Sequence, residues 1–68
     1  MKQYRTQEQF EEIAANCING NWTDAGKNCV EYGFYANDLI KANEENNLFN
    51  ELTDIAVLVE IAMEQRSK

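Results

Sequence analysis

The sequence predicts a small all-α protein, a single acidic domain (residues 1–68) folded as a bundle of three or four short helices. Three observations predict this class. Apolar residues recur at helical spacing in several segments, no alternation of apolar and polar residues persists long enough for a strand, and no repeat, low-complexity tract or interdomain linker is visible. Hydrophobic residues make up 44% of the chain and charged residues 26%, which is typical of a chain that folds.

The first helix is expected between Thr6 and Asn19. Thr6 and Gln9 have the spacing of a capping box, in which each side chain binds the backbone of the other residue. Gly20 follows at the position where helices often end in a left-handed residue. The apolar residues repeat as one helix face should, and they are Phe10, Ile13, Ala14, Cys17 and Ile18.

The second helix is expected to begin after Asn21 or Thr23, since either side chain can cap it, and to continue to about Ala36. Its inward stripe consists mostly of small residues, namely Trp22, Gly26, Cys29 and Gly33. Glycine destabilises an exposed helix by about 1 kcal/mol relative to alanine, so this stripe predicts that another helix approaches closely.

A short third helix is expected to start at a cap formed by Asn37 or Asp38 and to run through Ala42. One long helix with a bend near residues 33–37 fits the sequence almost as well. Residues 43–47 are polar and rich in capping types, which predicts a connection to the last helix.

The last helix is expected from about Leu48 to Gln65. At 100° per residue its apolar sector contains Leu52, Ile55, Val59, Ala62 and Met63, with Phe49 and Ala56 at the edge. The same geometry places Val57 and Ile61 on the side toward water. They are either isolated surface residues or the face of a homodimer or partner contact.

The residue inventory excludes several kinds of chemistry. The chain has no His and a single Ser, Ser67, which removes Ser-His and Cys-His catalysis and His-based metal sites. We therefore expect no catalytic residue, no metal and no cofactor. Cys17 and Cys29 lack metal or redox spacing and are expected to be buried reduced thiols, with a disulfide between the first two helices as the alternative.

No segment has the features of a membrane span or a secretion signal. The longest aliphatic run, residues 55–59, is far shorter than the roughly 20 residues that cross a bilayer. The N-terminal residues contain no apolar segment of the kind found in secretory signals. A cytoplasmic location is the resulting expectation.

The charge distribution is the main functional clue. The net charge is −6, but four of the six basic residues lie near the chain ends: Lys2, Arg5, Arg66 and Lys68. Residues 6–65 contain all twelve acidic residues and two basic ones, a local charge of −10. This predicts a negative potential over much of the surface, and it argues against direct binding to DNA, which needs Lys and Arg at the phosphates.

Two interpretations of this charge are open. It either only keeps the protein in solution, or its carboxylates bind Arg and Lys on a partner that normally holds nucleic-acid phosphates. Tyrosines among the acids would add contact area to such an interface. The candidate partner-binding residues are Glu8, Glu11, Glu12, Glu31, Tyr32, Tyr35, Asp38, Glu44 and Glu45.

In size, acidity and helical make-up the chain resembles small inhibitors carried by phages and mobile elements, such as DNA-mimicking anti-restriction and anti-CRISPR proteins; no sequence motif is shared. The leading hypothesis is a non-enzymatic inhibitor that presents Glu and Asp to the basic, nucleic-acid-binding surface of a host protein. The alternative is a structural or regulatory adaptor that homodimerises through Val57 and Ile61. A subunit of a larger assembly is a third possibility.

Overall fold

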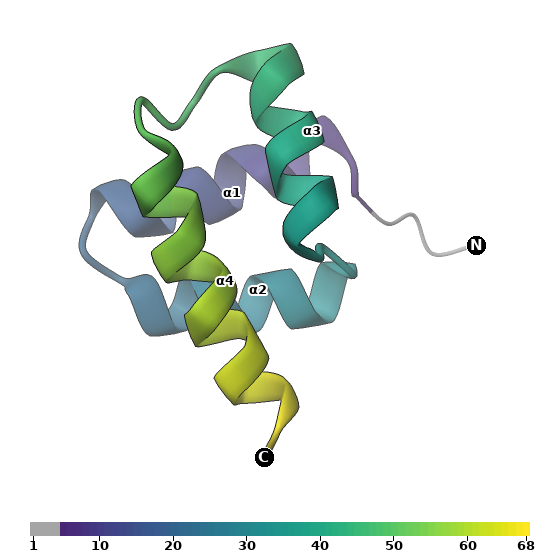
Figure 1. The fold of residues 1–68 in the computed structure, drawn as a ribbon, viewed down its shortest axis with the longest axis vertical. Coiled ribbons are helices and arrows are strands. Elements are labelled where there is room, and N and C mark those ends of the chain that lie inside the picture. Colours follow the sequence, from purple (N-terminus) through teal and green to yellow (C-terminus); the bar gives the residue numbers. More distant parts are fainter. Residues whose placement is uncertain (1–4) are drawn as a thin grey trace.

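The structure, a computed structural model, describes residues 5–68 and contains four helices there, with no strand among the described residues (Figure 1). The helices are α1 (Gln7–Ile18), α2 (Trp22–Tyr32), α3 (Ala36–Asn46) and α4 (Leu52–Arg66). The most extensive helix contacts are those of α2 with α4 and with α1, and the contact of α3 with α4 is smaller. The predicted all-α bundle is confirmed.

Helix α1 is built as the sequence predicts. The Thr6 hydroxyl accepts a hydrogen bond from the Gln9 backbone N–H at 3.2 Å, and the Thr6 N–H donates to Gln9 Oε1 at 3.0 Å. Both halves of the capping box therefore form. The helix ends at Ile18, and Gly20 follows with a left-handed φ of 81°.

Two separate helices replace the long bent helix that was the alternative for residues 22–43. Gly33 adopts a φ of 75° and terminates α2 at Tyr32, so the expected end at Ala36 is wrong. The expectation that Gly33 belongs to the inward stripe is also wrong, because it occupies the left-handed position that ends the helix. The start after Asn21 is confirmed, although the Asn21 side chain makes no capping hydrogen bond.

Helix α3 starts earlier and ends later than expected. Its N-cap is Tyr35, whose N–H donates to the Asp38 carboxylate at 3.0 Å, so Asn37 and Asp38 lie inside the first turn instead of capping it. The helix continues beyond Ala42 to Asn46 and is capped by Asn47, which adopts a φ of 48°.

The expected connection at residues 43–47 is therefore wrong, and the actual connection precedes Leu52. The reason is a pair of hydrogen bonds between one side chain and one backbone unit. Asn43 Oδ1 accepts from the Phe49 N–H at 2.8 Å, and Asn43 Nδ2 donates to the Phe49 carbonyl at 3.1 Å. These bonds hold the loop while the Phe49 side chain is buried, so the last helix starts at Leu52 and not at Leu48.

The core combines residues of all four helices with two loop phenylalanines. Phe34 and Phe49 pack on Phe10, with ring centroids 6.2 and 5.7 Å away. The buried hydrophobic residues are Phe10, Ile13, Ala14, Cys17, Ala25, Cys29, Phe34, Leu39, Phe49, Ile55, Leu58 and Ala62. Both cysteines are free and buried, which confirms the thiol prediction over the disulfide.

Helix α4 is rotated relative to the predicted sector. Its buried residues are Ile55, Leu58 and Ala62, whereas Leu52 and Met63, which were expected to face inward, are 69% and 58% exposed. The close helix approach predicted from small residues causes the rotation, because α2 and α4 meet at Gly26. A Cβ atom added there would lie 2.5 Å from Ile61 Cγ2.

Candidate acidic interface

The nine predicted partner-binding residues fall into two groups in the structure. The first group lies on α1 and at the end of α2, and we call it the acidic face: Glu8, Glu11, Glu12, Glu31 and Tyr32. The second group lies at the start and end of α3: Tyr35, Asp38, Glu44 and Glu45. The two groups differ in how their charges are compensated.

The three α1 glutamates of the acidic face are exposed because the opposite side of this helix is buried. Glu8 and Glu12 lie one turn apart, and this like-charge spacing destabilises a helix by a few tenths of a kcal/mol. Glu11 accepts a hydrogen bond from Gln7 Nε2 at 3.2 Å. All three carboxylates therefore direct negative charge outward from one helix.

Tyr32 connects the two helices of the acidic face. Its hydroxyl donates to Glu12 Oε2 at 2.9 Å, which joins the end of α2 to the middle of α1. This hydrogen bond raises the pKa of Tyr32, since it stabilises the neutral phenol and the charges of Glu12 and Glu31 oppose the phenolate. Glu31 directly precedes Tyr32 on α2, and its charge acts on the same hydroxyl as that of Glu12.

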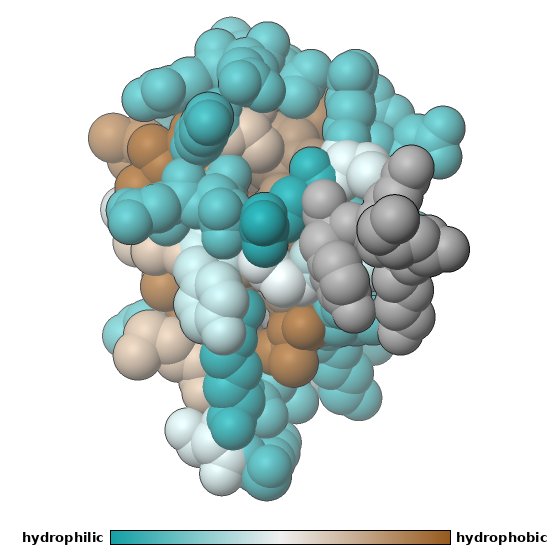
Figure 2. Space-filling model, turned by 90° about the vertical axis from the view of Figure 1, so that its right-hand side faces the viewer, coloured by the Kyte–Doolittle hydropathy of each residue, from teal (hydrophilic) through white to brown (hydrophobic). Residues whose placement is uncertain are grey.

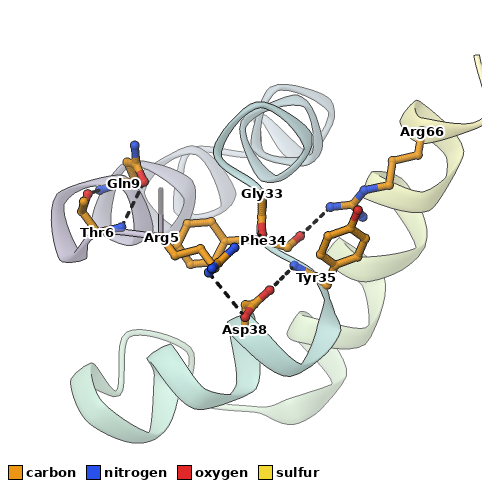
Figure 3. A network of polar contacts seen from close by, with 8 residues as sticks. All are labelled: Arg5, Thr6, Gln9, Gly33, Phe34, Tyr35, Asp38 and Arg66. Atoms are coloured by element: carbon orange, nitrogen blue, oxygen red, sulfur yellow. Dashed lines mark hydrogen bonds and ion pairs between the residues drawn. The ribbon is translucent and has the colours of Figure 1, made fainter. Parts of the chain in front are cut away.

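Two members of the second group, Tyr35 and Asp38, are involved in contacts within the fold (Figure 3). Besides capping α3, Asp38 forms an ion pair with Arg5, with 3.7 Å between Oδ1 and Nε. The Arg66 guanidinium lies 4.1 Å from the centre of the Tyr35 ring and donates to the Phe34 carbonyl at 2.7 Å. Asp38 and Tyr35 therefore have internal partners that the sequence analysis missed.

The surface next to Asp38 carries both signs of charge. A hollow of about 250 Å³ is lined there by Arg5, Phe34, Asp38, Lys41, Ala42 and Glu45. Two basic and two acidic side chains meet in it, so Glu45 adds little net charge. Glu44 is exposed on the same helix. The structure therefore does not join the second group to the acidic face as one continuous negative surface.

Within residues 5–68 the ion pair between Arg5 and Asp38 is the only one with nitrogen and oxygen closer than 4.0 Å. The four carboxylates of the acidic face consequently have no cationic partner in this part of the chain. The ion pair spans 33 positions and the Arg66 hydrogen bond spans 32. No local sequence pattern signals contacts of this range, which is why both escaped prediction.

The dimer face expected on α4 is only partly available. Val57 is exposed as predicted, but Ile61 is half-buried against Gly26 of α2, so its expected water-facing position is wrong. The close approach of α2 at this glycine accounts for the difference.

No other kind of site is found in residues 5–68. Among the described residues no cluster of three or more Cys, Asp or Glu side chains is arranged to hold a metal ion, and no helix has the length and apolarity needed to cross a membrane. No protein-family model, curated protein or solved structure matches the chain.

Proposed function

We propose that this chain is a non-enzymatic inhibitor whose acidic face binds Lys and Arg on the nucleic-acid-binding surface of a host protein. The observation that carries the proposal is that four exposed carboxylates lie on two neighbouring helices without an ion pair among residues 5–68. Carboxylates accept two parallel hydrogen bonds from one guanidinium, as phosphates do. A surface shaped to hold phosphates is therefore a chemically suitable partner.

Tyr32 supports the same proposal in a second way. Because its hydroxyl is bonded to Glu12, the ring and that carboxylate are held together at the centre of the acidic face. An ordered aromatic ring among charges supplies contact area with little loss of side-chain freedom on binding. The homodimeric adaptor is less favoured, since Ile61 already contacts α2.

The test is affinity capture from host lysate at low and high salt, with the captured protein then challenged by duplex DNA and by RNA. We expect a basic protein that is released by nucleic acid and lost as salt rises, since steered contacts between charges are screened. Capture of partners that are neither basic nor displaced by nucleic acid would contradict the proposal.

A matched pair of triple variants separates the acidic face from overall charge. Glu8→Gln/Glu11→Gln/Glu12→Gln removes three charges from α1, and Asp24→Asn/Glu45→Gln/Asp54→Asn removes one charge each from α2, α3 and α4, outside the acidic face. Only the first is expected to abolish capture. Equal losses would mean that net charge alone attracts the partner and that the acidic face is not a binding site.

A further inference from the structure

Helix α4 carries a second apolar stripe, of which only Val59 packs against the core. Leu52, Ala56, Val59 and Met63 recur at intervals of four, three and four residues, which is the spacing of a seam that packs on another helix. Leu52 and Met63 are mostly exposed. In Figure 2 hydrophobic residues reach the surface at several points along the left-hand edge, which is the side nearest the viewer in Figure 1.

Helix α3 turns this stripe into a groove. A hollow of about 320 Å³, which we call the α3–α4 groove, is lined by Ala36, Ile40, Leu52, Ile55, Ala56 and Val59. Beyond Val59 it is continued by a hollow of about 510 Å³ that includes Met63 and ends at Tyr35 and Arg66. An apolar groove between two helices is a surface on which an amphipathic helix of another protein can bind.

The border of the groove is acidic. Glu44 lies one turn beyond Ile40 on α3, Glu51 immediately precedes Leu52, and both are exposed. On the outer side of α4, Glu60 follows Ala56 by one turn and Glu64 follows Glu60 by another, and these are exposed too. At the far end, the Arg66 guanidinium is held by the Phe34 carbonyl and the Tyr35 ring.

From this geometry we infer that the α3–α4 groove binds a basic amphipathic helix of a partner protein. The apolar face of such a helix fills the groove while its Lys and Arg side chains meet Glu44, Glu51, Glu60 and Glu64. Met63 supplies a flexible, polarizable contact that adapts to different apolar side chains. A second copy of this chain is the poorer occupant, because it would bring a second acidic border against the first.

The α3–α4 groove is a different surface from the acidic face of α1 and α2, so the inference stands if the proposed function fails. The probe is a synthetic peptide of about 15 residues, which as a helix is about 22 Å long and matches α4. Its Leu residues lie on one helical face and its Lys residues on the other. A shuffled peptide of the same composition has no apolar face, and a third peptide carries Glu in place of Lys.

We expect one amphipathic Leu/Lys peptide to bind per chain, the shuffled peptide to bind at least about tenfold more weakly, and the Glu peptide not to bind. Leu52→Ser and Met63→Ser should each weaken binding about tenfold. Ile18→Ser is the matched control, since Ile18 is 79% exposed on α1, outside the groove, and this variant should bind like the parent chain.

Three outcomes would overturn the inference. Equal binding of the amphipathic and shuffled peptides would mean that charge alone drives the interaction. Equal losses of peptide affinity in Leu52→Ser, Met63→Ser and Ile18→Ser would mean that the groove is not the binding site. A dimer in sedimentation that Leu52→Ser converts to monomer would show that a second copy fills it. The variant Glu8→Gln/Glu11→Gln/Glu12→Gln should keep the preference for the amphipathic peptide, which separates this result from the proposed function.

Discussion

Helix α4 contacts α2 and α3 in opposite ways. Against α2 the backbones approach so closely at Gly26 that no Cβ atom fits beside Ile61, and Leu58 is completely buried. Against α3 the contact is smaller, and the α3–α4 groove remains open. One helix therefore completes the core on one side and offers an apolar binding surface on the other, and the two sides should respond differently to equivalent substitutions.

The largest contrast is expected between two leucines of α4. Leu58→Ala removes a fully buried side chain and leaves a cavity, which should lower the free energy of unfolding by about 2–5 kcal/mol. Leu52→Ala, on the exposed side, should change it by about 0.5 kcal/mol or less. Urea denaturation of both variants gives the comparison, and similar losses would contradict the orientation of α4.

The two buried thiols should make the stability of the fold depend on pH. Burial raises the pKa of Cys17 to about 11 and of Cys29 to about 12, from an ordinary value of 9.0; the negative charge of Asp54 also raises that of Cys17. Between these values the unfolded chain has released protons that the folded chain keeps, so stability is retained below pH 9 and falls as pH rises above it.

For each thiol the expected loss above pH 9 is at most about 1.4 kcal/mol per pH unit. Cys29→Ala should flatten this dependence in denaturant titrations between pH 8 and about pH 11. A parent chain whose stability changes no more steeply with pH than that of Cys29→Ala would mean that the thiol is not protected by the fold.

Gly26→Ala tests the closest point of the tight contact. The added methyl group meets Ile61 Cγ2, and overpacking of this kind costs about 1–3 kcal/mol, offset by about 1 kcal/mol of improved helix propensity. Adding Ile61→Ala removes the obstructing atom. The double variant should therefore be about 1 kcal/mol more stable than the sum of the two single changes predicts. Strict additivity would mean that the two residues are not in contact.

A modest stability effect is expected where the end of α4 contacts the start of α3. Arg66→Gln removes the hydrogen bond to the Phe34 carbonyl and the stacking on Tyr35, contacts that join the end of α4 to the start of α3. Partial exposure of Arg66 limits the loss to about 1 kcal/mol. Lys68→Gln makes the same charge change at an exposed position and should have no measurable effect in thermal unfolding.

Local sequence signals predicted the parts of the fold that depend on local contacts. The Thr6 and Gln9 capping box and Gly20 define α1 because their partners lie within a few residues. Gly26 predicted a close helix approach, and the structure leaves room for only a hydrogen atom at this position. The four glutamates of the acidic face were predictable from the buried sides of α1 and α2.

The orientation of α4 was not predictable because this helix is apolar on several sides. Leu52, Val59 and Met63 form as good an apolar stripe as the buried one, and only the packing of α2 decides between the two. The loop before α4 depends on how Asn43 binds the backbone of Phe49, a contact indistinguishable in sequence from an ordinary polar connection. The contacts of Asp38 with Arg5 and of Tyr35 with Arg66 were not predictable either, because these residues lie far apart in the sequence.

The most direct test of the proposed function is competition between this chain and duplex DNA for the captured basic partner. The parent chain should displace DNA from that partner, and the variant Glu8→Gln/Glu11→Gln/Glu12→Gln should fail to do so. The variant Asp24→Asn/Glu45→Gln/Asp54→Asn, which loses the same charge outside the acidic face, should compete like the parent. Simultaneous binding of DNA and the parent chain to one partner molecule would contradict the proposal that the acidic face occupies a phosphate-binding surface.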